Sequence, residues 1–329
     1  MNKIRVGLAG CGHMGRFHAA KLSELDDVDF IGCYDIDPAK SRDISGKYKN
    51  RIFENLDDLC ANIDAVCIAV PTRFHHSVAE LFLAERKSVL LEKPIAESIE
   101  AAERLVKLAE KNNVVLQVGH SERFNPAFLA VEKGISNPRF IETHRLAPYK
   151  GRGDDVAVIL DLMIHDLDLI MALTGSVPSY IDAAGVAIIT NTIDIANARL
   201  KFDNGCVANV TASRISVKEM RKLRVFQKSG YTSIDMATKE AEQYIVASPG
   251  EPDFDKASIF GKMSLPDGRA IVRRSIKIPA GDNLKFEIKS FVEAVRGVHP
   301  PAISGRDGLN VLIVATEIEN LCKKYLAKL

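Results

Sequence analysis

Short apolar runs alternate with helical patterns along the first 120 residues. Two longer segments, 77–86 and 98–112, repeat their apolar side chains at helical spacing. The runs that we interpret as strands are 4–9, 28–37, 51–53, 64–70, 88–92 and 114–119. Strands that alternate with helices predict a doubly wound parallel sheet, in which ligands bind beyond the carboxyl ends of the strands. We therefore expect an N-terminal domain over residues 1–120.

The pattern changes after residue 121. Apolar and polar residues alternate in steps of two through 180–216, 220–246 and 263–281, and "FDNG" at 202–205 is typical of a hairpin turn. Two amphipathic segments then end the chain. We expect an α+β domain over residues 121–329 with a large, open, mostly antiparallel sheet, so that the whole protein is α/β. The open face of such a sheet needs a cover, which predicts a homo-oligomer, either a dimer or a tetramer.

One segment between these patterns, residues 158–175, is almost wholly apolar and still carries four ionisable residues. At about 100° per residue, Asp161, His165 and Asp168 fall within about 60° of arc, whereas Asp166 lies off this stripe. Ionisable groups in a narrow buried stripe are costly unless they are paired or used. The stripe indicates a functional site. The alternative is a structural cluster whose members pair with one another.

The turn after the first strand has the spacing of a dinucleotide-binding loop. Its residues include Gly10, Gly12, His13, Met14 and Gly15, and Asp35 ends the second strand. The three glycines permit a tight turn, let a pyrophosphate approach the backbone, and let helix and strand pack closely. A carboxylate at Asp35 accepts hydrogen bonds from ribose hydroxyls and repels a 2′-phosphate, so the sequence predicts a Rossmann-type site for NAD. The alternative is a tight turn whose glycines serve packing only.

Polar residues also follow the next strands at the edge where ligands bind. These residues are Pro71, Thr72 and His75 after the fourth strand, Glu92, Lys93 and Pro94 after the fifth, and 120–125 after the sixth. We expect Pro71, Thr72, His75, Glu92 and Lys93 to contact the cofactor. Lys93 stands between a glutamate and a proline and points at the nicotinamide end of the crevice. The alternative is an ordinary strand-end lysine.

Composition narrows the classes of partner. The chain has 329 residues, 47% of them hydrophobic, and 44 Lys and Arg against 43 Asp and Glu give a net charge of +1. No global field would draw it to nucleic acid or to an anionic membrane, so we expect a small-molecule partner. Six scattered cysteines without paired spacing predict a reducing compartment and no metal site. Neither a signal peptide nor an 18-residue apolar run is evident, which predicts a cytoplasmic protein.

Three motifs together resemble the glucose-fructose oxidoreductase, inositol dehydrogenase and MocA family of NAD(P)-dependent sugar dehydrogenases. They are "GLAGCGHMGRFHA", the segment from "AVPTRFHH" to "LLEKPIAES", and Asp161-x-x-x-His165-x-x-Asp168, and the resemblance spans essentially the whole chain. It implies that Lys93, Asp161 and His165 line the site where a sugar hydroxyl meets the nicotinamide. His165 is the expected general base, and Lys93 would stabilise the alkoxide, although Lys93 is also open as the proton acceptor. Asp161 would orient His165 or hold a neighbouring hydroxyl. Asp168 either supports Lys93 or His165 from behind or makes a helix-surface contact.

A narrower resemblance concerns the substrate. "ERFNPA" together with "DLMIHDLDL" is similar to the subgroup of UDP-N-acetylglucosamine 3-dehydrogenases, which oxidise the sugar 3-hydroxyl to a ketone for an aminotransferase in lipid A synthesis. A UDP-sugar needs donors for two phosphates, and the loops carry a basic cluster. Its members are Arg123, Arg145, Tyr149, Lys150 and Arg152. We expect Arg123, with the neighbouring Asn125, and Arg152 to bind substrate. The alternative is that such loop side chains are only solvated.

Three other functions stay open. The first is the same chemistry on an uncharged polyol such as inositol, which would leave the basic loops unused. The second is reduction of a double bond or imine, as in relatives that resemble biliverdin reductase, but these often lack the histidine and aspartate pair. The third is a non-catalytic, NAD-dependent sensor or scaffold, against which an intact Lys93, Asp161 and His165 argues.

Overall fold

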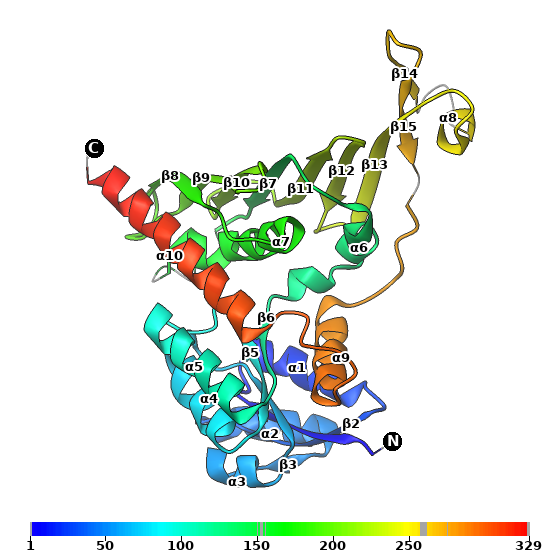
Figure 1. Ribbon diagram of the computed structural model, residues 1–329. Helices are drawn as coiled ribbons and strands as arrows, with labels where there is room; N and C mark the ends of the chain where they lie inside the picture. Colours follow the sequence, from blue (N-terminus) through cyan, green and yellow to red (C-terminus); the bar gives the residue numbers. More distant parts are fainter. Residues whose placement is uncertain are drawn as a thin grey trace. The chain divides into compact units, whose positions relative to one another are not determined.

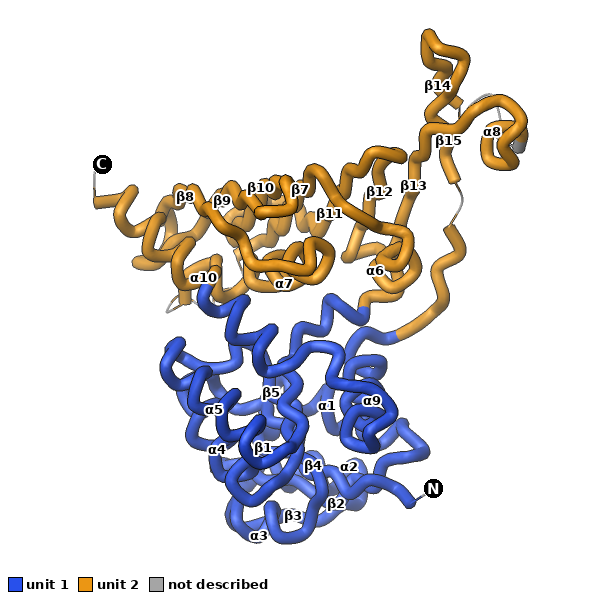
Figure 2. The backbone as a smooth tube through the Cα atoms, in the orientation of Figure 1, with its two compact units in different colours: residues 1–124, 282–313 blue, residues 125–281, 314–329 orange. Residues whose placement is uncertain are grey.

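The structure, a computed structural model, describes residues 2–149, 151, 154, 156–256, 262–274 and 276–327. The chain forms two compact units (Figure 2), the first from residues 1–124 and 282–313 and the second from residues 125–281 and 314–329. This division differs from the two consecutive domains, 1–120 and 121–329, that the sequence suggested. The physical reason is the apolar face of one late helix, α9 (Asn283–Val295), because its Ile288, Phe291 and Val292 belong to the core of the first unit.

A parallel sheet forms the centre of the first unit. Within the described residues it has six strands in the order β3-β2-β1-β4-β5-β6, and all neighbouring pairs are parallel. The strands are β1 (Ile4–Ala9), β2 (Val28–Tyr34), β3 (Arg51–Ile52), β4 (Ala65–Ile68), β5 (Ser88–Glu92) and β6 (Leu116–Gly119). The predicted doubly wound sheet is confirmed.

Helices cover both faces of this sheet (Figure 1). They are α1 (His13–Ser23), α2 (Pro38–Tyr48), α3 (Leu56–Ala61), α4 (His75–Ala84), α5 (Ile99–Asn112), α9 and the first part of α10 (Gly305–Leu326), with short 3₁₀ turns η1 (Thr72–Phe74) and η2 (Ser121–Phe124). One face packs on α1, α2 and α9 through a shared apolar core. The other face packs on α3, α4 and α5, and Gly7 of β1 leaves the room that Leu59 of α3 occupies. Both faces of the strands are therefore apolar, as a parallel sheet requires.

A mostly antiparallel sheet forms the second unit. Counted over the described residues it has nine strands in the order β14-β15-β13-β12-β11-β7-β10-β9-β8, and β7 and β10 pair in parallel. The strands are β7 (Phe140–Leu146), β8 (Tyr180–Val186), β9 (Ile195–Lys201), β10 (Val207–Ser213), β11 (Met220–Gln227), β12 (Gly230–Asp235), β13 (Glu240–Ala247), β14 (Lys262–Ser264) and β15 (Ala270–Arg274). This sheet confirms the second half of the expected fold class.

Helices cover one face of the second sheet. They are α6 (Pro126–Leu129), the 3₁₀ turn η3 (Glu132–Gly134), the π-helix η4 (Ile159–Met163), α7 (Ile164–Thr174), α8 (Pro252–Lys256) and the end of α10. The helix α7 packs on β7 and β10, and Cys322 of α10 contacts Gly185 of β8. Side chains along β7 and β9 alternate between buried and partly or fully exposed positions. The alternating pattern in the sequence therefore reports a sheet with one covered face and one open face.

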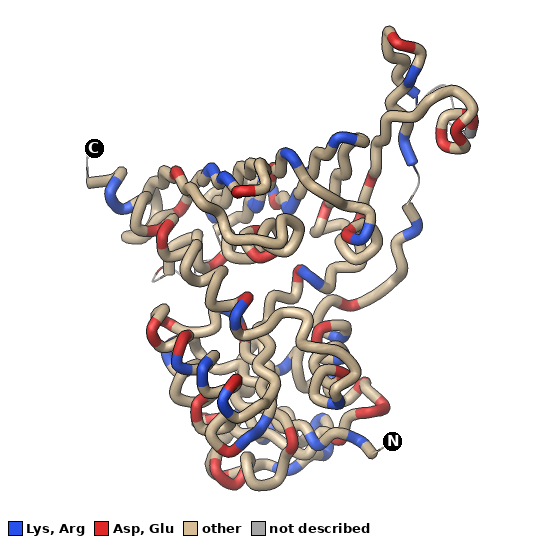
Figure 3. Tube along the Cα trace, viewed as in Figure 1, with Lys and Arg blue, Asp and Glu red and all other residues tan. Residues whose placement is uncertain are grey.

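The turn between β9 and β10, the distribution of charge and the hydropathy of the helices can each be compared with the sequence. The turn "FDNG" joins β9 and β10 as predicted, with Gly205 at φ +83°, a conformation that glycine adopts without strain. Acidic and basic residues are interspersed along both units (Figure 3). None of the helices in the described ranges combines the length and hydropathy that a membrane-spanning segment needs.

Candidate functional site

The glycine loop of the first unit has the geometry that its spacing predicted. Gly10 adopts φ +93°, and a Cβ there would lie 2.6 Å from the carbonyl oxygen of Ala69. A Cβ on Gly15 would collide with the carbonyl oxygen of Gly10, so this glycine is what lets α1 approach β1. No atom lies within 4 Å of the corresponding position on Gly12. The backbone at Gly12 is thus open to a ligand at the start of α1, where His13 and Met14 are exposed.

Asp35 fixes this loop to the end of β2. Its Oδ2 accepts a hydrogen bond from the backbone N–H of Cys11 at 2.7 Å, and its Oδ1 accepts one from the N–H of Asp37 at 2.8 Å. A carboxylate has further acceptor positions on both oxygens, so these bonds leave room for hydroxyl donors. The ribose contact of Asp35 stays a prediction, and the sequence did not indicate its structural role, which is to hold the glycine loop at Cys11.

The ends of β4 and β5 are joined by a buried histidine. His75, the first residue of α4, has its Nδ1 at 2.7 Å from the carbonyl oxygen of Pro94 and its Nε2 at 3.0 Å from that of Val70. Burial lowers the pKa of His75, and the two carbonyl oxygens oppose this shift. We expected His75 to contact the cofactor. Its residue is 1% exposed and its ring braces two strand ends, so the contact with cofactor stays a prediction, while Pro71 and Thr72 are more accessible in the turn before it.

A second buried histidine holds the glutamate beside Lys93. Nε2 of His18, on α1, lies 2.8 Å from Oε1 of Glu92, the last residue of β5. Burial alone would raise the pKa of Glu92, but the hydrogen bond from His18 and nearby positive charge, including Lys93, lower it below its ordinary value. Lys93 follows directly and is half-buried at the carboxyl end of β5. The edge therefore presents an ionised carboxylate beside an ammonium group.

The expected substrate pair after β6 is divided between the units. Arg123 lies half-buried in η2 of the first unit, whereas Asn125 is a buried residue of the second. Asn125 caps α6, because its Oδ1 accepts from the N–H of Ala127 at 3.1 Å, and its Nδ2 donates to the carbonyl oxygen of Met236 at 3.0 Å. Both ends of the Asn125 amide thus take part in structural hydrogen bonds, and its expected contact with substrate stays a prediction.

The polar helix of the second unit is not a uniform α-helix. Asp161 lies in the π-helix Ile159–Met163, and His165 lies in the first turn of α7. A π turn inserts an extra residue per turn, so the stripe expected from α-helical spacing is wrong in part. Asp161 and His165 are partly exposed, but Asp168 is fully buried. Two of the three expected residues are thus accessible, and single π turns of this kind are frequent at functional sites.

Asp166, which the sequence placed off the stripe, forms a buried ion pair with Arg145 of β7. Nε and Nη2 of Arg145 donate to the two carboxylate oxygens, each at 2.9 Å, and both side chains are at most 5% exposed. This pair corrects the expectation that Arg145 belongs to a phosphate-binding cluster. A buried arginine in a bidentate pair is committed to its carboxylate.

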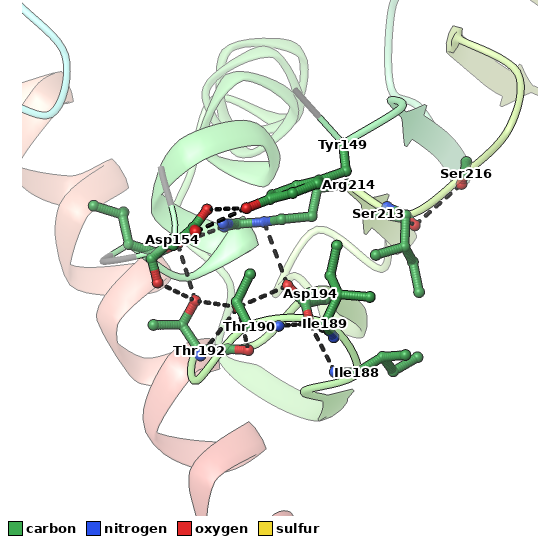
Figure 4. Close-up of polar contacts among 12 residues, drawn as sticks. Tyr149, Asp154, Ile188, Ile189, Thr190, Thr192, Asp194, Ser213, Arg214 and Ser216 are labelled. Atoms are coloured by element: carbon green, nitrogen blue, oxygen red, sulfur yellow. Dashed lines mark hydrogen bonds and ion pairs between the residues drawn. The ribbon is translucent and has the colours of Figure 1, made fainter. Parts of the chain in front are cut away.

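The chain that enters the π-helix is held by a second buried acid. Asp194 accepts hydrogen bonds from the N–H groups of Ile188, Ile189 and Thr190 at 2.7, 2.7 and 3.0 Å (Figure 4). Burial raises the pKa of Asp194, but the backbone donors outweigh this effect and the pKa lies below its ordinary value. Arg214, whose Nε lies 3.9 Å from this carboxylate, donates from Nη2 to the carbonyl oxygen of Val156.

Of the remaining members of the basic cluster, the structure describes Tyr149. Tyr149 is exposed, and its hydroxyl donates to the carboxylate of Asp154 at 2.6 and 2.7 Å, which raises the pKa of the phenol. Figure 4 shows the Tyr149 ring beside the Arg214 guanidinium. Lys150 and Arg152 lie outside the described residues. The sequence reading missed His18, Asp194 and Arg214, because a single polar residue inside an apolar pattern carries no signal of its partner.

Comparisons with known proteins agree with this arrangement. The family model described as "Oxidoreductase family, NAD-binding Rossmann fold" matches residues 4–120, and the model of the GFO/IDH/MocA C-terminal domain matches residues 136–232. The chain is 33% identical over 329 residues to the UDP-N-acetylglucosamine 3-dehydrogenase of Acidithiobacillus ferrooxidans, with 100% of both chains covered. A solved structure of that enzyme superposes with a TM-score of 0.88 over 99% of this chain and 100% of that chain.

Inositol dehydrogenases are more distant relatives. The inositol 2-dehydrogenase of Rhizobium meliloti is 30% identical over 221 residues, which cover 64% of this chain and 66% of that protein. The scyllo-inositol dehydrogenase of Lactobacillus casei, solved with NAD(H) and scyllo-inositol, has a TM-score of 0.77 at 20% identity over 98% of both chains, and this likeness shows the fold alone. With the glycine loop, both family models and a full-length relative in agreement, this chain belongs to the GFO/IDH/MocA family of oxidoreductases with an NAD-binding Rossmann fold.

Proposed function

We propose that this enzyme is an NAD-dependent dehydrogenase that oxidises a secondary hydroxyl of a nucleotide sugar, with UDP-N-acetylglucosamine and its 3-keto product as the best-supported pair. The observation that carries the proposal is the 33% identity to a UDP-N-acetylglucosamine 3-dehydrogenase over the full length of both chains. The residues suit the chemistry, since an ammonium, an imidazole and a carboxylate stand at accessible edges at Lys93, His165 and Asp161.

The chain's own residues would divide the chemistry as follows. Bound NAD would accept a hydride from the carbinol carbon. His165 is placed to take the hydroxyl proton, and Asp161 to orient that imidazole or to bind a neighbouring hydroxyl. Lys93 would stabilise the developing alkoxide by its charge. Lys93 is the alternative proton acceptor, and the variants described in the Discussion distinguish the two.

The choice of NAD over NADP rests on Asp35. Its carboxylate is fixed by two backbone N–H groups at the end of β2, the strand end at which a Rossmann sheet receives the adenosine ribose. A fixed negative charge there favours two free hydroxyls and disfavours a 2′-phosphate.

The nucleotide part of the substrate needs cationic donors. Arg123 remains our candidate ligand for the phosphates, because it is half-buried at the carboxyl end of the first sheet, and Arg152 stays a sequence-based candidate. We also propose that an aminotransferase consumes the ketone, since alcohol oxidation by NAD is thermodynamically uphill and needs removal of its product. All six cysteines are free and buried, which fits a reducing compartment such as the cytoplasm.

We further propose that the enzyme works as a homo-oligomer through the open face of the second sheet. Four aromatic side chains run across this face from neighbouring strands: Phe140, Phe226, Tyr231 and Tyr244, with successive ring centroids 5.9, 5.3 and 4.7 Å apart. Such a row is typical of a surface that a second copy covers. Light scattering on the purified protein gives the mass, and a monomer at micromolar concentration would contradict this proposal.

The deciding experiment incubates the purified enzyme with NAD and UDP-N-acetylglucosamine at mildly alkaline pH and follows NADH absorbance. An aminotransferase with its amino donor, or a carbonyl trap, is added to draw the reaction forward. We expect NADH to form with UDP-N-acetylglucosamine and NAD, to form more slowly with NADP, and not to form with inositol. Turnover of inositol alone would support the polyol dehydrogenase, which the inositol 2-dehydrogenase relatives favour. Ligand binding without turnover of either compound would support a sensor.

A further inference from the structure

The contact between His18 and Glu92 joins two segments that the sequence keeps 74 residues apart. His18 lies on the buried face of α1 and is 1% exposed, and Glu92 is the residue directly before Lys93. The 2.8 Å contact is a short hydrogen bond to a group that is already largely removed from water. His18 differs from an ordinary buried histidine because it is hydrogen-bonded to the residue directly before Lys93.

The chemistry of the two groups defines which of them donates. The pKa of Glu92 lies below its ordinary value, so the carboxylate is ionised and only accepts. His18 must therefore carry a proton on Nε2. Its Nδ1 is buried, and among the described residues no hydrogen-bond partner reaches it, so a proton on Nδ1 would be desolvated without compensation. The hydrogen bond therefore runs from Nε2–H of His18 to Oε1 of Glu92.

A glycine on β6 leaves room for Glu92. A Cβ added to Gly119 would lie 3.2 Å from Cα and 3.4 Å from Oε2 of Glu92. A larger residue at position 119 would press on the backbone at the end of β5. The Glu92 side chain is thus placed by a donor on α1 in a space that a glycine on β6 keeps open.

We propose that His18 is a positioning residue of this enzyme, which holds the Glu92 carboxylate in place and ionised and thereby fixes the end of β5 that presents Lys93. The inference rests on the role given to Lys93 in the proposed function. It goes beyond that function by assigning a role to a residue on α1 that contacts neither the reacting atoms nor Lys93 directly.

Loss of the hydrogen bond has a defined electrostatic consequence. The titratable groups that face Glu92 are His18 on α1, His75 on α4, Cys67 on β4 and Lys93 beside it. Burial raises the pKa of Cys67 far above its ordinary value, so this thiol contributes no charge near neutral pH. Without the donor on α1, burial would dominate and the pKa of Glu92 would rise. A neutral Glu92 would then persist to higher pH.

The test compares two substitutions in the full-length enzyme. His18→Leu keeps apolar volume and removes the donor, whereas His18→Gln replaces the ring with an amide N–H. We expect His18→Leu to lower kcat by about ten- to a hundredfold with little change in KM, which is the range for a lost hydrogen bond to a charged group. We also expect the acid limb of its pH profile to move to higher pH by about one unit or more, because one unit is what a lost bond of this strength yields. His18→Gln should recover most of the rate and the original acid limb.

Matched controls separate this role from simple damage to the fold. His299, in the same unit, faces Glu293 at 3.3 Å in a partly exposed pair, and His299→Leu should leave kcat and the pH profile unchanged. Glu92→Gln should lower kcat without adding to the loss in His18→Leu, because both changes remove the same interaction. If His18→Leu is too unstable to purify, the cycle is built on His18→Phe, which also removes the donor and keeps an apolar ring in the core.

The failure of this inference differs from the failure of the proposed function. If Lys93→Ala retains full activity, the role of Lys93 falls and the inference falls with it. If Lys93→Ala loses activity but His18→Leu keeps the normal kcat and acid limb, the proposed function stands and His18 is only a packing residue. A lower kcat in His18→Leu with an unshifted acid limb and no rescue by His18→Gln would also overturn the inference.

Discussion

The end of β5 in the first unit and the π-helix in the second both hold polar side chains at an accessible edge of an apolar element. The interactions that hold these side chains differ between the two units. In the first unit a parallel sheet does this by topology, since the carboxyl end of β5 places Lys93 at the ligand edge and His18 and His75 brace it. In the second unit buried charged groups do this. The Arg145–Asp166 ion pair joins β7 to α7, which carries His165, and Asp194 binds the backbone N–H groups of residues 188–190.

The difference shows which part of a site can be altered without loss of the fold. The braces of the first unit are hydrogen bonds between buried histidine rings and either a carboxylate or backbone carbonyl oxygens. The braces of the second are fully desolvated charges, and removal of one partner leaves the other uncompensated. We therefore expect changes in the first unit to appear mainly in catalysis, and changes in the second to appear mainly in stability.

The largest effect is expected for Lys93→Ala in the first unit. It should lower kcat by about a thousandfold or more, because it removes the charge that stabilises the developing alkoxide, while the melting temperature changes little. Lys107→Ala, on the exposed side of α5, is the matched control and should keep full activity. His165→Asn tested in parallel identifies the proton acceptor, since only loss of the acceptor removes the acid limb of the pH profile. A Lys93→Ala enzyme with the normal rate would contradict a catalytic role for the lysine at the end of β5.

The next effect is on stability in the second unit. Arg145→Leu should lower the free energy of unfolding by about 3–5 kcal/mol, because Asp166 remains buried without its partner. Arg145→Leu combined with Asp166→Leu should recover most of this loss, and urea titration measures both. Equal stability of the single and double variants would show that the pair does not matter as an ion pair.

A smaller effect with a defined pH dependence is expected for Asp194→Asn. The pKa of Asp194 lies below its ordinary value of 3.8, so the folded state binds this proton less tightly than the unfolded state does. The stabilisation is therefore complete above the ordinary pKa and is lost as pH falls through the lowered value. At pH 7 the variant should be less stable by about 1–3 kcal/mol. Urea titrations at pH 7 and pH 3 should show the difference shrinking at the lower pH, and a constant difference would contradict this assignment.

The smallest effect concerns the coenzyme. Asp35→Asn keeps an acceptor oxygen for one of the two backbone N–H groups and removes the charge that repels a 2′-phosphate. The ratio of kcat/KM for NAD to that for NADP should fall by about tenfold, as removal of one unfavourable charge contact allows. An unchanged ratio would place coenzyme selection elsewhere in the first unit.

The predictions from sequence succeeded where function follows from local pattern. The spacing of Gly10, Gly12 and Gly15 after an apolar strand could be read directly, because each glycine is required by the backbone of its own turn. The position of Lys93 followed from the end of a strand in an alternating β-α pattern. The polar stripe predicted for Asp161 and His165 from α-helical spacing was less accurate, because a π turn changes the angle per residue and the local sequence gives no sign of that turn.

The chain alone determined the two kinds of sheet, the glycine loop, the acid at the end of β2 and the lysine at the end of β5, since periodicity and spacing fix these within a few residues of one another. Only the tertiary structure decided that Arg145 pairs with Asp166, that Asn125 caps a helix and that His18 serves Glu92. These contacts join segments far apart in the chain, and the energy of a buried polar group depends on the partner that folding brings to it.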